Sequence, residues 1–279
     1  MAEPSMSDIK SMKLYTHVER IENELAELGR ARADELTVAE LSAFDQLHYH
    51  GTEALDHALQ RLATAPGQHW LEIGSGIGGP ARYLAQQGQL QMTALELQPD
   101  QNELATQLTR RCNMSSRVEH LCGDFLNYDF AGQRFDAIVS WLALYHIPER
   151  PLLMERCHEL LTPGGYFYTE DLCSLAPMDA TQLADLERDL YAITLPRIEE
   201  YRRDLEAAGF EVEDCDDMSA DWSEFTRIRL AAYRAERARH VRVHDEATVQ
   251  ALDDFYSAVD HHFGSGKLGG LRLCARRRD

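Results

Sequence analysis

Basic residues are scarce in this sequence relative to acidic ones. The chain has 279 residues, of which 28 are Lys or Arg and 47 are Asp or Glu, so its formal net charge is −19 at pH 7. A surface of that sign repels phosphate backbones and anionic lipid headgroups. We therefore expect neither a nucleic-acid partner nor a membrane partner, and an excess of acid also serves solubility.

Long apolar runs and paired cysteine motifs are missing as well. No run of about 18 apolar residues occurs, and no basic stretch leads into an apolar one at the start. The six cysteines lie far apart, without the Cys and His spacings of a zinc site. These absences predict a reduced cytoplasmic protein that is not exported, does not span a membrane and holds no metal.

What is present is a helical lead-in followed by alternating strands and helices. An apolar fraction of 44% is sufficient for a core. Periodicity predicts helices over residues 9–32, 36–46 and 52–63. Strands are then expected at 69–74, 91–98 and 117–124, at the start of the apolar stretch 135–146, where residues 140–142 end the strand, and at 165–173. Helices are expected between them at 78–87, 99–111 and 148–161. This alternation predicts an α/β fold with a Rossmann-like, doubly wound and mostly parallel sheet.

The last third of the sequence is less regular. Helices are expected over 178–191, 196–208 and most of 222–259, and strands over 209–218 and 268–278 complete a sheet of seven. We divide the chain into a helical segment or lid at 1–65, a ligand-binding core at 66–175, and cap helices with the final strands at 176–279.

A glycine-rich turn follows the first predicted strand, in the stretch L-E-I-G-S-G-I-G-G that begins at Leu71. Glycines at this spacing let the backbone approach a nucleotide-like ligand closely. Glu72 lies inside the strand, where a carboxylate needs a partner that a cationic or amino-bearing ligand would supply. A lone G-x-G-x-x-G match is weak, so an NAD-dependent oxidoreductase stays a remote alternative.

This stretch resembles the first motif of class I S-adenosylmethionine-dependent methyltransferases, and later segments resemble their other motifs in order. Glu96, after the second strand, matches the acid that binds the ribose hydroxyls, and Asp124 matches the residue that accepts from the adenine amine. The resemblance implies S-adenosylmethionine as cofactor. The implied cofactor-binding residues are Tyr49, Glu72, Gly74, Ser75, Gly76, Gly78, Glu96, Leu97, Gly123, Asp124, Phe125, Ser140 and Trp141.

A narrower resemblance concerns the methyl acceptor. L-Y-H-I-P-E-R, which contains His146, resembles the L-H-I-x-D-K stretch of phosphoethanolamine N-methyltransferases, and T-E-D-L-C is similar to their T-D-Y-C. Sarcosine and dimethylglycine N-methyltransferases share the layout. The resemblance implies His146 as the base that removes a proton, with Tyr49 or Tyr15 as its partner, and a histidine titrates near neutral pH.

Four further residues are candidates for contact with the acceptor. His50 lies in the polar aromatic segment 46–51, and Tyr145 precedes the candidate base. Glu170 and Asp171 end the fifth strand, where neighbouring side chains point to opposite faces. Only one of them is then expected to face the pocket, and the resemblance favours Asp171 as a ligand for a cationic amine.

We therefore predict an S-adenosylmethionine-dependent methyltransferase of small molecules, with N-methylation of a small amine as the first reaction. S-methylation of a small thiol and O-methylation of a natural product are the alternatives. The region 179–221 lacks a recognisable set of phosphate-binding residues, which argues against phosphoethanolamine itself. The basic stretch 229–242 either forms an exposed helical face or binds an anion. The acceptor's identity, the number of methyl groups added and the oligomeric state stay open.

Overall fold

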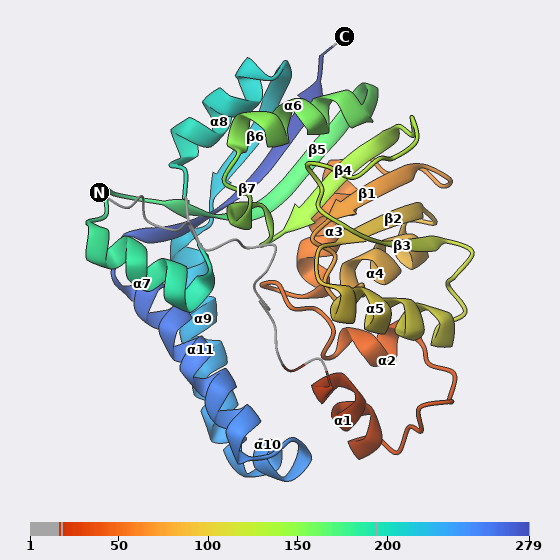
Figure 1. Ribbon diagram of the computed structural model, residues 1–279, viewed down its shortest axis with the longest axis vertical. Coiled ribbons are helices and arrows are strands. Elements are labelled where there is room, and N and C mark those ends of the chain that lie inside the picture. The colour runs from red at the N-terminus through yellow and green to blue at the C-terminus, as the bar shows by residue number, and fades with distance from the viewer. Residues whose placement is uncertain (1–16, 18, 193–194, 279) are drawn as a thin grey trace.

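The computed structural model of the chain describes residues 17, 19–192 and 195–278. Its centre is a seven-stranded sheet in the order β3-β2-β1-β4-β5-β7-β6 (Figure 1). The strands are β1 His69–Ile73, β2 Gln91–Glu96, β3 Val118–Cys122, β4 Phe135–Trp141, β5 Leu161–Ser174, β6 Phe210–Asp217 and β7 Leu268–Arg277. The first five are parallel, and β7 runs antiparallel to both β5 and β6. The predicted Rossmann-like sheet is confirmed.

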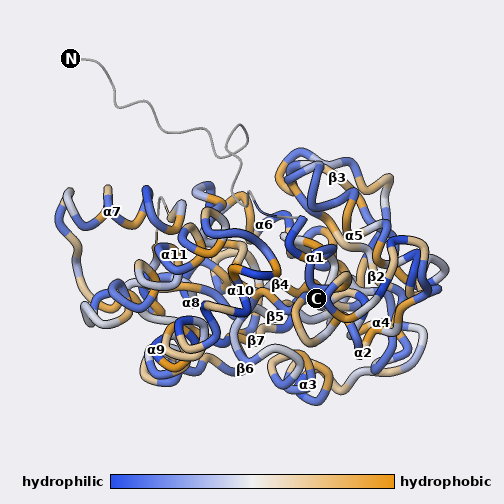
Figure 2. The backbone as a smooth tube through the Cα atoms, turned by 90° about the horizontal axis from the view of Figure 1, so that it is seen from below, coloured by the Kyte–Doolittle hydropathy of each residue, from blue (hydrophilic) through white to orange (hydrophobic). Residues whose placement is uncertain are grey.

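Helices cover both faces of this sheet. They are α1 Arg20–Glu27, α2 Val38–Ser42, α3 Thr52–Arg61, α4 Gly79–Gln87, α5 Pro99–Arg111, α6 Arg150–Leu160, α7 Ala180–Leu190, α8 Ile198–Ala207, α9 Ser219–Ala235, α10 Arg237–Val243 and α11 Glu246–Gly264. Neighbouring strand residues point to opposite faces, so Trp70 packs with α3 and α4 while Leu71 packs with α6 and α8. Figure 2 shows α3 and α6 on opposite sides of β4 and β5.

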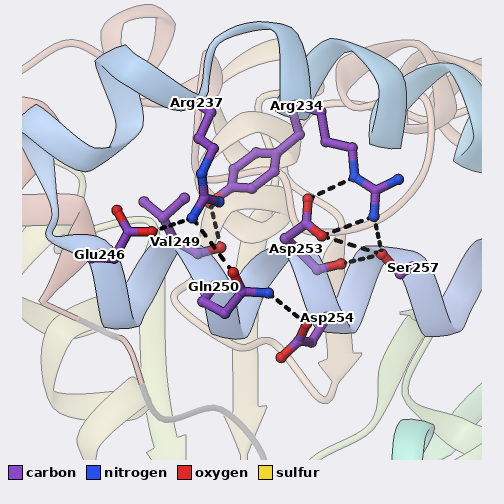
Figure 3. A network of polar contacts seen from close by, with 9 residues as sticks. Arg234, Arg237, Glu246, Val249, Gln250, Asp253, Asp254 and Ser257 are labelled. Atoms are coloured by element: carbon purple, nitrogen blue, oxygen red, sulfur yellow. Dashed lines mark hydrogen bonds and ion pairs between the residues drawn. The ribbon is translucent and has the colours of Figure 1, made fainter.

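Helices α9 and α11 lie side by side and extend away from the sheet, with α10 at their far end and α1 facing it (Figure 1). Polar contacts join the two long helices, as Figure 3 shows. Arg234 of α9 donates to Asp253 at 2.8 Å and to Ser257 at 2.7 Å, both in α11. No helix among the described residues is long and apolar enough to cross a membrane.

The elements outside the core differ from the predictions in length. The helix predicted over 9–32 is present only as α1, and residues 1–16 and 18 lie outside the described residues. The helix predicted over 36–46 ends at Ser42, and the chain then turns inward so that the carboxylate of Asp45 reaches Arg82, 2.9 Å away. The strand predicted at the start of the stretch 135–146 ends at Trp141, where the next residue, Leu142, adopts a positive φ of 53°. The three-part division of the chain stays a prediction.

Candidate active site

A cavity of about 1370 Å³ lies at the carboxyl ends of β1, β2 and β4. The strand order reverses between β1 and β4, and open α/β sheets bind their ligands at such a point. Several stretches of chain form its walls: residues 42–51, 72–77, 95–97, 123–126, 141–149 and 189–191, together with parts of α1, α9, α10 and α11. The cavity therefore lies between the carboxyl ends of these strands and the long helices α9 and α11.

The glycine-rich turn after β1 forms one side of this cavity. Gly74 and Gly76 adopt φ values of 72° and 52°, and a Cβ added at Gly74 would lie 2.3 Å from that of Ala143. The buried hydroxyl of Ser75 has no hydrogen-bond partner. Gly78 is not among the described residues that line the cavity, because the side where its Cβ would be faces His120 at 2.6 Å. Gly78 thus serves the packing of α4, whereas Gly74, Ser75 and Gly76 face the cavity.

Two buried carboxylates stand beside the turn. Glu72 is 1% exposed, and its Oε2 atom has no hydrogen-bond partner. Burial, and secondly the charge of Glu96, raise the pKa of Glu72 well above its ordinary 4.5. Burial also raises the pKa of Glu96, although the N–H groups of Gln98 and Gly76 donate to its carboxylate at 2.8 Å and act in the opposite direction. Together the pair forms an acidic site suited to amino and hydroxyl groups.

The remaining predicted cofactor residues divide into two groups. Leu97, Gly123, Asp124 and Phe125 line the cavity beyond Glu96, and Trp141 lines it with a buried indole N–H that has no partner. Ser140 is not among the described lining residues. Its hydroxyl donates to the carbonyl of Ile73 at 2.8 Å and so joins β4 to β1.

His146 lies on the cavity wall in a short 3₁₀ turn, Leu144–His146. Its Nδ1 is 3.2 Å from the carbonyl oxygen of Tyr191, which can only accept, so Nδ1 carries the proton. Its Nε2 is buried without a partner, and burial lowers the pKa of His146 to about 4. The ring of Tyr145 lies 3.9 Å from the imidazole, centroid to centroid. A neutral imidazole with a free Nε2 is a proton acceptor.

Tyr49 and His50 line the same cavity but are not joined to this imidazole. Within the described part of the chain, no hydrogen bond connects Tyr49 with His146; the Tyr49 ring packs 4.9 Å from Trp222. His50 places Nε2 2.5 Å from the carboxylate of Asp221. Tyr15, the other predicted partner, lies outside the described residues.

Glu170 and Asp171 do not lie where we expected a substrate ligand, because neither is among the described residues that line the cavity. Asp171 accepts from the Tyr145 backbone N–H and from the Tyr201 hydroxyl, both at 3.3 Å. Glu170 accepts from Arg272 at 2.8 Å. Both carboxylates are buried and have partners from distant parts of the sequence, and Asp171 also positions the 3₁₀ turn through the Tyr145 N–H.

The cavity walls formed by α1, α9, α10 and α11 hold none of the individual site residues predicted from the sequence. Phe225, Arg229 and Tyr256 contribute one wall, and Glu24 and His244 contribute another. The only signal in the sequence was the helical spacing of aromatic residues in this region, which packing alone also explains. Glu24, His240 and His244 have ligand atoms within 4.8 Å of one another, but Arg239 also donates to Glu24 at 2.5 Å. We therefore interpret this cluster as an ion-pair contact between α1 and α10.

Comparisons with known proteins agree with this arrangement. The profile of a family described as "Methyltransferase domain" matches residues 47–214. Methyltransferase GfsG of Streptomyces halstedii is 26% identical over 64% of this chain and 65% of its own length, so the chain spans less than two thirds of that relative. The 27-O-demethylrifamycin SV methyltransferase of Amycolatopsis mediterranei is 25% identical over 82% of this chain and 84% of its own.

A solved structure with a similar fold is that of Haemonchus contortus phosphoethanolamine N-methyltransferase 2 in complex with phosphomonomethylethanolamine and S-adenosylhomocysteine. Its TM-score is 0.76 at 20% identity, with 85% of this chain and 55% of that chain covered.

Proposed function

The chain belongs to the methyltransferase domain family, and on that premise we propose that its cavity binds S-adenosylmethionine together with a small-molecule methyl acceptor. The observation that carries this proposal is a set of buried polar atoms that face the cavity without partners. Near the glycine turn and the 3₁₀ turn they are Glu72 Oε2, Ser75 Oγ, Trp141 Nε1 and His146 Nε2. Buried polar groups are nearly always hydrogen-bonded, so these four atoms await a ligand.

The residues present fit this cofactor. Glu72 would hold the amino group of the methionine end, Glu96 the ribose hydroxyls, and Asp124 the adenine amine. The turn 74–76 lets the backbone approach without Cβ clashes. When bound, S-adenosylmethionine supplies a methyl group on a positively charged sulfur. Its charge and its amino group also match the acidic character of this end of the cavity.

The chain's own part in the reaction is to align the acceptor, exclude water and remove a proton. His146 is the candidate base, since the carbonyl of Tyr191 fixes the tautomer that leaves Nε2 free to accept. With a pKa of about 4, the imidazole is neutral throughout the physiological range. It is therefore always in the form that can take a proton, although burial makes it a weak base.

The geometry best supports an acceptor that is larger and more apolar than a simple amine. Ligand pockets usually measure about 300–1,000 Å³, so a cavity of about 1370 Å³ has room for the cofactor and a drug-sized molecule. Phe225, Phe255 and Tyr256 line this space, whereas Asp171, predicted to hold a cationic amine, is not among the described lining residues. We propose O-methylation of a hydroxyl group on a largely apolar compound.

N-methylation of a small amine is the second candidate. Trp141 and Tyr145 line the cavity near the base, and such rings hold a cationic amine by about 0.5–2 kcal/mol. The similar fold of a phosphoethanolamine N-methyltransferase adds to this candidate.

A screen with methyl-labelled S-adenosylmethionine tests the proposal. The panel pairs apolar phenols and alcohols with amines and thiols of the same carbon skeleton, and mass fragmentation identifies the methylated atom. We expect label on oxygen in the larger apolar compounds. Label confined to small amines would contradict O-methylation and support N-methylation of a small amine. No label in any compound would contradict the methyltransferase activity.

A further inference from the structure

Helices α9 and α10 carry six arginines, and five of them have a carboxylate partner. The pairs are Arg227 with Glu224 at 2.6 Å, Arg234 with Asp253 at 2.8 Å, Arg237 with Glu246, Arg239 with Glu24 at 2.5 Å and Arg242 with Glu27 at 2.5 Å. Figure 3 shows two of them: Arg234 reaches from α9 to α11, and Arg237 reaches from α10 to α11. In a chain with 47 acidic residues, such pairing is the expected state of an arginine.

Arg229 is the exception. Among the described residues no carboxylate lies within ion-pair distance of its guanidinium, and its Nε atom is buried without a hydrogen-bond partner. The guanidinium carbon lies 4.7 Å from the ring centroid of Tyr256, 5.1 Å from that of Tyr49 and 5.6 Å from that of Phe225. The side chain lines the cavity. Arg229 thus lines the cavity with its guanidinium packed among three aromatic rings.

Those surroundings make the guanidinium a receptor for an anion. Cation–π contacts offset part of the cost of removing a guanidinium from water but leave its N–H donors available. Its neighbour Tyr49 is a phenol whose pKa burial raises, while the charge and a hydrogen bond of Arg229 act in the opposite direction. A neutral phenol satisfies one donor at most. A carboxylate or another oxyanion would take two donors at once and supply the missing charge.

We propose that Arg229 binds an anionic group of the methyl acceptor, so that the substrate is a largely apolar compound with a carboxylate or a similar oxyanion. The proposal rests on the proposed function, since it assigns this wall of the cavity to the acceptor. It narrows the substrate class by one chemical group and makes Arg229 a specificity-determining residue.

Two fluorescent probes that differ only in charge test this proposal directly. Anilinonaphthalene sulfonate is an apolar anion, and phenylnaphthylamine is the same ring system without the sulfonate. Both are titrated into the chain saturated with S-adenosylhomocysteine, whose own affinity is measured by calorimetry. We expect the sulfonate to bind at least about tenfold more tightly than the neutral probe, as a charge-assisted hydrogen bond implies.

The variant Arg229→Met keeps the length of the side chain and removes its charge. It should abolish the preference for the sulfonate and leave the affinities for phenylnaphthylamine and S-adenosylhomocysteine within about twofold. Arg229→Lys should keep part of the preference. The matched control is Arg227→Met, two residues away on the same helix, where the arginine pairs with Glu224 at the surface; it should behave as the unmodified chain.

A wild-type chain that binds the sulfonate no better than phenylnaphthylamine would overturn the proposal, and so would an unchanged preference in Arg229→Met. A chain that fails to bind S-adenosylhomocysteine contradicts the proposed function instead. Because the two readouts are separate, the two failures are distinguishable.

Discussion

Glu72 shows at the scale of one residue how a binding site and a stable fold make opposite demands. Its carboxylate is buried, one oxygen has no partner, and burial raises its pKa. The folded chain therefore holds the Glu72 proton more tightly than the unfolded chain does. The contribution of this residue to stability is present below its ordinary pKa of 4.5 and is lost as the pH rises through the folded-state value.

We predict that Glu72→Gln stabilises the ligand-free chain at pH 7 and weakens cofactor binding. The free energy of unfolding should rise by about 1 kcal/mol, which corresponds to a Tm increase of about 2–4 °C for a domain of this size. The Kd for S-adenosylhomocysteine should rise at least about tenfold, because the amino group loses a charged partner. Calorimetry and thermal unfolding measure the two effects.

The same residue gives the affinity for S-adenosylhomocysteine a pH dependence. The affinity should increase as the pH rises above 4.5 through the raised pKa of Glu72, and Glu72→Gln should flatten this increase. Glu119→Gln, at an exposed position on β3, is the matched control and should leave both stability and affinity unchanged. Equal pH profiles for the unmodified chain and Glu72→Gln would remove Glu72 from the binding site.

His146 carries the second prediction at this scale. His146→Ala should leave the affinity for S-adenosylhomocysteine nearly unchanged and lower kcat by roughly 10²–10⁴-fold, the usual effect of losing a general base. His261→Ala, at an exposed position on α11, should keep full turnover. An unchanged kcat in His146→Ala would show that His146 is not the general base and that solvent takes the proton.

At the scale of elements, ion pairs join α1 to α10 beside the cavity. Glu24 accepts from Arg239 at 2.5 Å and lies 3.0 Å from His244 Nε2, and Glu27 pairs with Arg242 at 2.5 Å. Burial raises the pKa of Glu24, but the hydrogen bonds and charges of Arg239 and His244 outweigh it and lower the pKa below 4.5. This contact is therefore fully formed above pH 4.5 and is lost as the pH falls through the lowered value.

We predict that Glu24→Gln loosens α1 without unfolding the core. Partly exposed ion pairs contribute about 0.2–1 kcal/mol each, so hydrogen exchange of the α1 amides should accelerate by about twofold to fivefold. The matched control is Glu224→Gln, which breaks an ion pair within α9 and should leave α1 exchange unchanged. If both variants behave alike, α1 is held by apolar packing through Ile21 and Leu25 and not by this contact.

The elements differ in how well their sequences predict them. Helix α5 spans the predicted 99–111, because Pro99 gives a start signal and the apolar spacing is regular. The helix predicted over 36–46 ends at Ser42, because the chain then turns inward and Asp45 pairs with Arg82, a contact that no local signal marks. The missed features of the site share one cause: partners far apart in the sequence, as with Asp171 and Tyr201, which lie 30 residues apart.

At the scale of the whole molecule, the predicted cofactor residues lie at the carboxyl ends of the strands. The cavity walls that we assign to the methyl acceptor come from the two ends of the described chain. The alternation of strands and helices and the glycine turn follow from local patterns, so the fold could be predicted, whereas the assignment of the cofactor residues stays a prediction. The acceptor walls depend on contacts such as that of Glu24 with Arg239, 215 residues apart, which no pattern within one segment can reveal.

We propose that the carboxyl ends of β1 and β2, with Glu72, the glycine turn and Glu96, bind S-adenosylmethionine and not a dinucleotide. Titration calorimetry of the full chain with S-adenosylhomocysteine and, separately, with NADH tests it most directly. We expect a Kd in the micromolar range for S-adenosylhomocysteine, weakened at least about tenfold in Glu96→Ala, and no heat of binding for NADH. Binding of NADH with no binding of S-adenosylhomocysteine would contradict it.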